Sequence, residues 1–364
     1  MLSNLIVSFP FYTGLPQRSR KAAADIRTVL GVFLLAGGLA LFLIPFSIAA
    51  SAPNGWASGY IIAMLVVGFL MLISFGLVQR YISPKPVVPF QLLISRSVLG
   101  ACLLDVTYQV SAYCYKSYFT SFLQVVFDVS IAEAGYIDGS WDIISGVWLI
   151  GVGICIRKTG YFKWLLWVFV PVYILGSGLL IYFRRPHMNV GYIVMCQVFL
   201  ALGGATMIIC QQVAVLAGAT HNNAAASLGI LGVFGNIGTS PLLHHHNLGV
   251  TTSYWMASLM LLSGGSVGSA ISGAIWTHTL PGALQRLLPA DALDQWEAIY
   301  ESLDIQTEYP TGTPIREAIM QAYAETQRNL VIAGTAIMAL ALAWVWMIKN
   351  TNLAKVEQVK GVLF

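Results

Sequence analysis

Charge is what this sequence has least of. Only 9% of its 364 residues are Asp, Glu, Lys or Arg, whereas 57% are hydrophobic, and its mean hydropathy is +0.74. A soluble domain of this length needs charged faces and alternating polar patterns, so this composition excludes one. The sequence also lacks a Walker loop, a dinucleotide-binding glycine fingerprint and a His-Glu-x-x-His motif. We therefore expect no enzyme and no cofactor.

Long apolar runs take the place of charged surfaces. About 20 helical residues cross a hydrocarbon core roughly 30 Å thick, and most of the runs reach that length. We predict an all-α, polytopic protein that is integral to the lipid bilayer. Eight runs are present, at 29–50, 60–79, 97–127, 140–156, 164–183, 190–217, 224–276 and 329–348.

The basic residues separate between alternate loops. If the first loop is cytosolic, thirteen of them lie inside, five lie outside and Lys116 lies within a run, so the positive-inside rule places both termini in the cytosol. This distribution explains the net charge of +4 without a nucleic-acid partner. The inside set is Arg18, Arg20, Lys21, Arg27, Arg80, Lys85, Arg96, Arg157, Lys158, Lys163, Lys349, Lys355 and Lys360, and the outside set is Arg184, Arg185, Arg286, Arg316 and Arg328.

Proline-rich and charged segments divide the chain. The turn signal at 52–56 joins the first two runs into a hairpin, and Pro84, Pro86 and Pro89 separate that hairpin from the remaining runs. The predicted parts are a cytosolic segment 1–28, an accessory transmembrane hairpin 29–81, a cytosolic linker 82–95, a six-helix bundle 96–350 and a cytosolic tail 351–364.

An acidic outer loop is predicted at 279–328, with room for two amphipathic helices. Asp291 is a candidate cap of the first, and Thr313 with Pro314 is an N-cap and N1 pair that opens the second. Two interpretations stay open: a lid over a substrate path, or a solvated connector. The run 224–276 is too long for one span and contains His244–His246, but successive histidines splay apart, so we expect no metal site there.

The run 97–127 is the most polar, and it carries the first candidate site. Asp105, Tyr108, Gln109 and Lys116 share one face of a helix, and polar groups at membrane depth should face a water-filled cavity or a partner. Asp105 is a candidate proton carrier, and Tyr108, Gln109 and Tyr118 can bind a polar ligand. The alternatives are an internal structural pair, or Lys116 extending toward the interface.

Two further groups of polar residues belong to other runs. Gln197 and Gln211 lie on one side of the run 190–217 and can form a second polar stripe, while its glycines favour close helix packing. Glu133, Asp138 and Asp142 lie at the predicted outer mouth of the fourth run, either to collect protons or cations or as helix caps and surface charges.

The loop 153–163 resembles the glycine and basic loop of the major facilitator superfamily, although Arg157 stands where that motif usually has Asp. Its candidate gating residues are Gly153, Arg157, Lys158, Gly160 and Lys163. Five longer stretches carry a more specific resemblance: GACLLDVTYQVSAYCYKSYFTSFLQVV, AEAGYIDGSWDIISGVWLIGVGICIRKTGYFKWLL, NVGYIVMCQVFLALGG, SAISGAIWTHTLPGALQRLLP and AETQRNLVIAGTAIMALALAWVWMIKN. Through these stretches the chain is similar to the fungal siderophore-iron transporters over about 90–364.

The resemblance implies a fourteen-span transporter in a plasma, endosomal or vesicular membrane, with a ferric siderophore and a proton as its partners in symport. It implies that 29–79 matches the seventh and eighth spans and 97–348 the C-terminal six-helix bundle. The N-terminal bundle is then missing, with impaired or no activity expected, and residues 239–264 are an anomalous insert such as a translated intron. The alternatives are a multidrug:proton antiporter of the same superfamily and a non-transporting membrane fragment.

Overall fold

The structure is a computed structural model that describes residues 57–81, 95–218 and 266–353, together with scattered positions within 31–48 and 227–232. Helices account for nearly all of this part, and none of it is a β-strand. The helices are α3 (Gly59–Tyr81), α5 (Arg96–Lys116), α6 (Phe119–Phe127), α7 (Ile131–Thr159), α8 (Lys163–Phe183), α9 (Val190–Ala217), α12 (Ser266–Leu287), η5 (Leu293–Gln295), α13 (Trp296–Glu301), α14 (Leu303–Glu308), α15 (Pro314–Met338) and α16 (Ala341–Met347).

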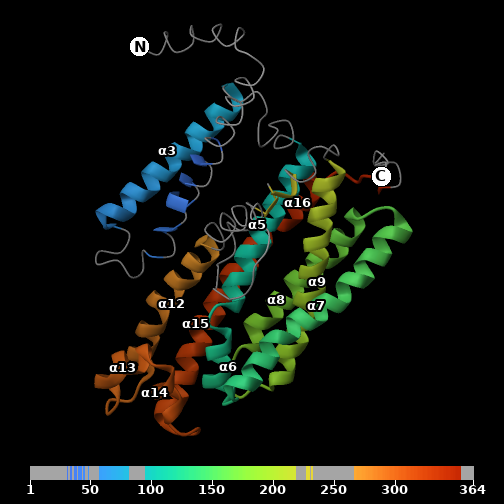
Figure 1. Cartoon of the computed structure of the whole chain (residues 1–364). Coiled ribbons are helices and arrows are strands. Elements are labelled where there is room, and N and C mark those ends of the chain that lie inside the picture. Colours follow the sequence, from blue (N-terminus) through green and yellow to red (C-terminus); the bar gives the residue numbers. More distant parts are fainter. Residues whose placement is uncertain are drawn as a thin grey trace, which may run out of the picture.

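The long helices from α5 onward pack side by side into one bundle, with α5 in contact with α9, α12, α15 and α16 (Figure 1). Five stretches are long and apolar enough to cross a membrane: Gly59–Val78, Ile131–Thr159, Lys163–Phe183, Val190–Ala217 and Pro314–Met347. The helices α5 and α12, which carry polar residues along their length, are not among these five. The predicted all-α membrane architecture is confirmed.

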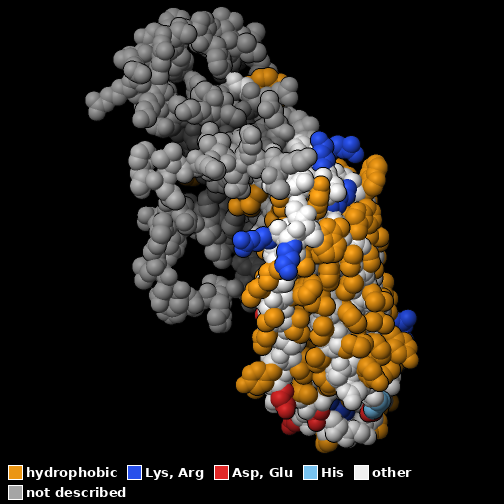
Figure 2. Space-filling model, turned by 90° about the vertical axis from the view of Figure 1, so that its right-hand side faces the viewer, with side chains coloured by type: hydrophobic (Ala, Val, Ile, Leu, Met, Phe, Trp, Pro, Cys, Tyr) orange, Lys and Arg blue, Asp and Glu red, His pale blue; other side chains and the backbone are white. Residues whose placement is uncertain are grey.

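The outer face of the bundle is apolar, as a bilayer requires. On α7, Ile143, Val147 and Ile150 are each at least 67% exposed, and Figure 2 shows hydrophobic side chains covering the visible face. In the same view most of the Lys and Arg side chains lie toward one end and Asp and Glu gather at the other. An apolar belt between two polar ends is the pattern of a membrane-spanning bundle.

The helix α3 belongs to the predicted hairpin. Phe69 of α3 lies 6.4 Å from Phe42 between ring centroids, and a Cβ added to Gly68 would lie 2.4 Å from the Phe42 backbone nitrogen. The described residues near Phe42 therefore pack closely against α3. In Figure 1, α3 stands apart from the bundle that contains α5, α7, α8, α9 and α15.

The run 97–127 is a broken helix, which its apolar pattern does not reveal. Helix α5 ends at Lys116, Tyr118 adopts the left-handed conformation with φ 58° and ψ 15°, and α6 begins at Phe119. A non-glycine residue with positive φ is uncommon and needs support from its surroundings. Tyr118 therefore lies in the break between two half-helices, and its side chain does not project from one continuous helix.

Glycine brings α8 and α9 together. A Cβ added to Gly203 of α9 would lie 2.6 Å from the Cβ of Tyr173, and one added to Gly176 of α8 would lie 2.8 Å from the Cβ of Phe199. Only a residue without a side chain allows this approach, which is the packing role expected of small residues in membrane helices.

Helices extend into the range 279–328, since α12 continues to Leu287 and α15 begins at Pro314. Thr313 caps α15 by accepting a hydrogen bond from the Arg316 backbone N–H, with Pro314 at the first helical position, as predicted. The proposed cap at Asp291 is wrong: the first helical turn after α12 is η5, which follows Ala292 and has no side-chain cap. The insert 239–264 and its histidines lie outside the described residues.

Candidate functional site

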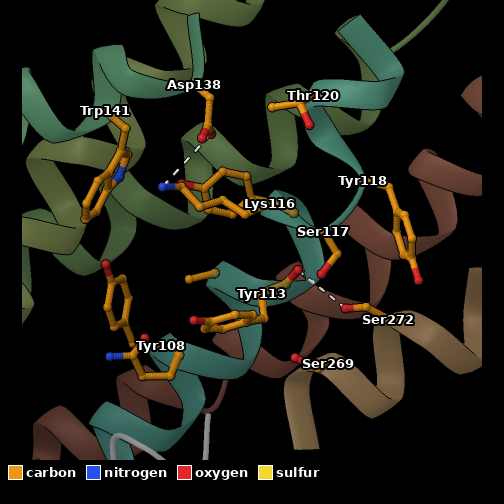
Figure 3. A pocket seen from close by; sticks show the side chains of 13 residues that line it. Tyr108, Tyr113, Lys116, Ser117, Tyr118, Thr120, Asp138, Trp141, Ser269 and Ser272 are labelled. Atoms are coloured by element: carbon orange, nitrogen blue, oxygen red, sulfur yellow. Dashed lines mark hydrogen bonds and ion pairs between the residues drawn. The ribbon is translucent and has the colours of Figure 1, made fainter. Parts of the chain in front are cut away.

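A cavity of about 670 Å³ opens beside the break between α5 and α6 (Figure 3). Its volume lies within the range of ligand pockets, roughly 300–1,000 Å³. The walls come from α5, the break, α6, α7 and α12. The lining residues are Tyr108, Gln109, Ala112, Tyr113, Tyr115, Lys116, Ser117, Tyr118, Thr120, Asp138, Trp141, Ser269 and Ser272.

One cation and one carboxylate face each other across this pocket. The Lys116 Nζ lies 4.0 Å from Asp138 Oδ1, and both side chains are one-third exposed. The same ammonium lies 4.8 Å from the centre of the Trp141 ring, so it also makes a cation–π contact. Lys116 therefore points into the pocket and toward α7, as Figure 3 shows, and does not extend to the membrane interface.

Aromatic rings form much of the remaining wall. Tyr118 stacks on Trp276 of α12 with ring centroids 3.9 Å apart, and Trp276 meets Tyr323 of α15 edge to face at 5.2 Å. The indole N–H of Trp141 is buried and has no hydrogen-bond partner in the described part of the chain. The pocket thus offers flat apolar faces, hydroxyl groups and an ammonium to a polar ligand.

Asp105 is buried on α5 but does not line this pocket. With the Gln211 amide nitrogen facing the carboxylate, Gln211 of α9 donates to Asp105 Oδ1 at 3.1 Å. No cation lies within salt-bridge distance of Asp105 among the described residues. Gln197 is also buried on α9, and both of its amide atoms lack a partner in that part of the chain.

The structure therefore divides the predicted site residues into two groups. Tyr108, Gln109 and Tyr118 meet at the pocket, together with Lys116 and Asp138. Asp105, Gln197 and Gln211 lie in the contact between α5 and α9 or within α9, away from the lining.

The three carboxylates of the predicted outer mouth, Glu133, Asp138 and Asp142, have different surroundings. Glu133 forms a capping box with Ser130 at the start of α7, so its carboxylate is used to begin the helix. Asp138 reaches the pocket, and Asp142, one turn further along, is exposed. Only Asp138 of this group meets a cation within 4.0 Å.

The predicted gating loop is attached to the C-terminal end of the last helix. Gly160 ends α7 in the left-handed conformation, and its carbonyl accepts a hydrogen bond from the Leu353 N–H. Lys163 Nζ donates to the carbonyls of Trp346 and Ile348 at the end of α16. Of the other loop residues, Arg157 and Lys158 are exposed, and Gly153 has open space around its Cα.

Two buried side chains beside the break were not predicted from the sequence. Arg184, which was counted as an outer-loop charge, is fully buried at the end of α8 and donates to the Tyr115 carbonyl at 2.7 Å. Gln327 of α15 is also fully buried and donates to the carbonyls of Ser117 and Tyr118. Neither residue is part of a polar stripe, so no sequence pattern indicated them.

The described residues contain no cluster of His, Cys, Asp or Glu able to hold a metal ion. Cys102, Cys114, Cys196 and Cys210 are free and buried, so they pack as small core residues.

The fold is similar to that of a solved transporter structure. A solved structure of a bacterial homolog of the human lysosomal transporter Spinster, in an inward-facing and occupied conformation, superposes with a TM-score of 0.51 at 16% identity, covering 94% of this chain and 73% of that one. No protein-family model matches the sequence.

Sequence comparison identifies the relatives. The chain is 54% identical to the MFS siderochrome iron transporter D of Aspergillus fumigatus, over 92% of this chain and 52% of that protein. It is 47% identical to the siderophore iron transporter mirB of Emericella nidulans and 32% identical to the siderophore iron transporter 1 of Schizosaccharomyces pombe, covering 51% and 50% of those proteins. The resemblance to the fungal siderophore-iron transporters is confirmed, and the chain spans about half the length of these relatives.

Proposed function

We propose that this chain contributes one half of the substrate path of a proton-coupled importer of ferric siderophore complexes. The observation that carries the proposal is the 54% identity to a siderochrome iron transporter across 92% of the chain. The pocket supports it, because a folded siderophore complex presents oxygen atoms and apolar segments at its surface. The Lys116 ammonium and the tyrosine hydroxyls suit the oxygens, and the ring faces suit the apolar segments.

Asp105 is the proposed proton carrier. It is 7% exposed and is bonded by an amide instead of being neutralised by a cation. A carboxyl group in that setting can exist with or without its proton, since no fixed positive charge holds it ionised. Gln211 would bond to either form by presenting its nitrogen or its oxygen. In this scheme Asp105 exchanges the coupling proton behind the pocket wall and does not touch the substrate.

The proposed orientation keeps both termini in the cytosol of a plasma or vesicular membrane. The basic loop at 157–163, the start of α5 and the end of α16 lie together at one end of the bundle. There the Lys349 N–H also donates to Ser97 Oγ at 3.1 Å. The acidic segment 288–313 follows the C-terminal end of α12 and lies at the opposite end of the bundle. Such segregation of Lys and Arg favours the cytosol for the first end.

The test is uptake of iron-55 as a ferric hydroxamate by fungal cells that express the protein from its complete reading frame. Asp105→Asn should abolish the dependence of uptake on external pH and lower its rate. The matched control is Asp304→Asn, which changes an exposed acid on α14 and should leave both properties as in the wild type. Unchanged uptake with an unchanged pH profile in Asp105→Asn removes Asp105 from the coupling role.

Growth separates this proposal from the antiporter alternative. An importer rescues growth on a ferric siderophore when iron is limiting, whereas a drug antiporter raises resistance to toxic compounds without that rescue. The names of the relatives favour the first outcome.

A further inference from the structure

A broken membrane helix leaves backbone groups that lipid cannot satisfy. The break after Lys116 interrupts the helical ladder, and carbonyls near it need donors from other parts of the protein. Each unsatisfied group in an apolar surrounding costs several kcal/mol, so the partners at this position decide whether the break persists.

Arg184 and Gln327 supply those donors from two different helices. The Arg184 guanidinium donates to the Tyr115 carbonyl at 2.7 Å and to the Gln327 side-chain oxygen. The Gln327 nitrogen then donates to the carbonyls of Tyr118 at 3.1 Å and Ser117 at 3.4 Å. One connected set of hydrogen bonds thus ties the end of α8 and the middle of α15 to the last turn of α5 and to the break.

Aromatic rings enclose this set. The Arg184 guanidinium carbon lies 4.8 Å from the centre of the Phe119 ring and 5.7 Å from that of Phe122. No carboxylate of the described residues lies within salt-bridge distance of Arg184. The charge is therefore balanced by carbonyl dipoles and ring faces, and replacing Gln327 removes a neutral partner that bonds both Arg184 and the backbone.

We propose that Arg184 and Gln327 are positioning residues for the ligand pocket, holding the break so that Lys116, Ser117 and Tyr118 face the cavity. The proposal rests on the proposed function only in naming the ligand. Neither residue lines the pocket, so neither touches the substrate. If the break straightened, Tyr118 would leave its stack on Trp276 and Lys116 would move relative to Asp138.

Gln327→Glu separates positioning from simple stability. A carboxylate keeps and strengthens the bond to Arg184 but cannot donate to the Ser117 and Tyr118 carbonyls. Gln327→Leu removes both interactions. Thr326→Val is the matched control. Thr326 is the neighbouring residue, is equally buried, and among the described residues its hydroxyl bonds only to the Ala322 carbonyl of its own helix.

The first readout is uptake of ferric hydroxamate by the complete protein. Loss of the donor should raise the KM about tenfold in Gln327→Glu and Gln327→Leu, with a smaller change in maximal rate per molecule, and leave the KM of Thr326→Val unchanged. A wild-type KM in Gln327→Glu would overturn the proposal, because the break would then not need this donor.

The second readout needs no transport. A cysteine introduced as Ser117→Cys lines the pocket, and its rate of reaction with a maleimide reports the local conformation. We expect a several-fold change of that rate when Gln327→Glu or Gln327→Leu is added, and none with Thr326→Val; equal rates in all backgrounds contradict the proposal. If no variant takes up siderophore while the labelling rates differ, the proposed function fails and the positioning role stands.

Discussion

Replacing Gly203 by alanine tests how closely α8 and α9 approach. The added Cβ would lie 2.6 Å from the Tyr173 Cβ and 2.8 Å from the Phe169 carbonyl oxygen. Carbon atoms in ordinary contact are about 3.5–4.0 Å apart, so α8 has to move away locally by about 1 Å. The obstacle includes backbone, which no rotamer change can displace.

Two opposing effects set the change in the free energy of unfolding caused by Gly203→Ala. Overpacking in a well-packed interior costs about 1–3 kcal/mol, and glycine to alanine in a helix gains up to about 1 kcal/mol. We therefore expect Gly203→Ala to lower the free energy of unfolding by about 1–2 kcal/mol. Gly178→Ala in α8 is the matched control, because nothing lies within 4 Å of its added Cβ and only the helix gain remains.

The assay is the fraction of protein that stays monodisperse in detergent after heating, followed by fluorescence size-exclusion chromatography. Gly203→Ala should melt at a lower temperature than the wild type, and Gly178→Ala at the same temperature or slightly above it. If both variants matched the wild type, the close approach of α8 and α9 would be refuted.

Three further predictions concern the pocket and α15. Gly204→Ala places its Cβ 2.8 Å from the Tyr108 hydroxyl, which belongs to a side chain and not to the backbone, so the KM for uptake should rise several-fold while the melting temperature falls less than in Gly203→Ala; the reverse order contradicts the packing. Lys116→Gln should weaken uptake strongly yet cost under about 1 kcal/mol of stability, because its pair with Asp138 is one-third exposed; a large loss of folded protein argues for a structural pair instead. Thr313→Ala removes the cap of α15 and should destabilise the protein by about 1 kcal/mol in the same heating assay, whereas an unchanged midpoint would show that the cap is dispensable.

The fold class, the course of the long helices and the start of α15 could be predicted from the sequence, because hydropathy, turn residues and caps are local signals. Thr313 followed by Pro314 shows this well, since both preferences belong to one turn of helix. The face of α5 that carries Tyr108 and Gln109 was also predictable from helical spacing.

The break at Tyr118 was not predictable in the same way. The carbonyls beside it accept hydrogen bonds from Arg184 and Gln327, which are far away in the sequence. A local hydropathy pattern cannot indicate such distant partners. The basic character of Arg184 and Arg316 was misleading for a related reason. Both were counted as outer charges, yet both are fully buried and bonded to backbone carbonyls.

The distance in sequence between the break and its donor has a consequence for biosynthesis. The carbonyls of Ser117 and Tyr118 accept hydrogen bonds from Gln327, which is synthesised about 210 residues later. While the ribosome is still making the intervening helices, an uninterrupted helix through 96–127 is the form that satisfies its own backbone in lipid. We therefore expect this segment to enter the bilayer as a straight helix and to break only after α15 has been inserted, which would complete the pocket late in synthesis.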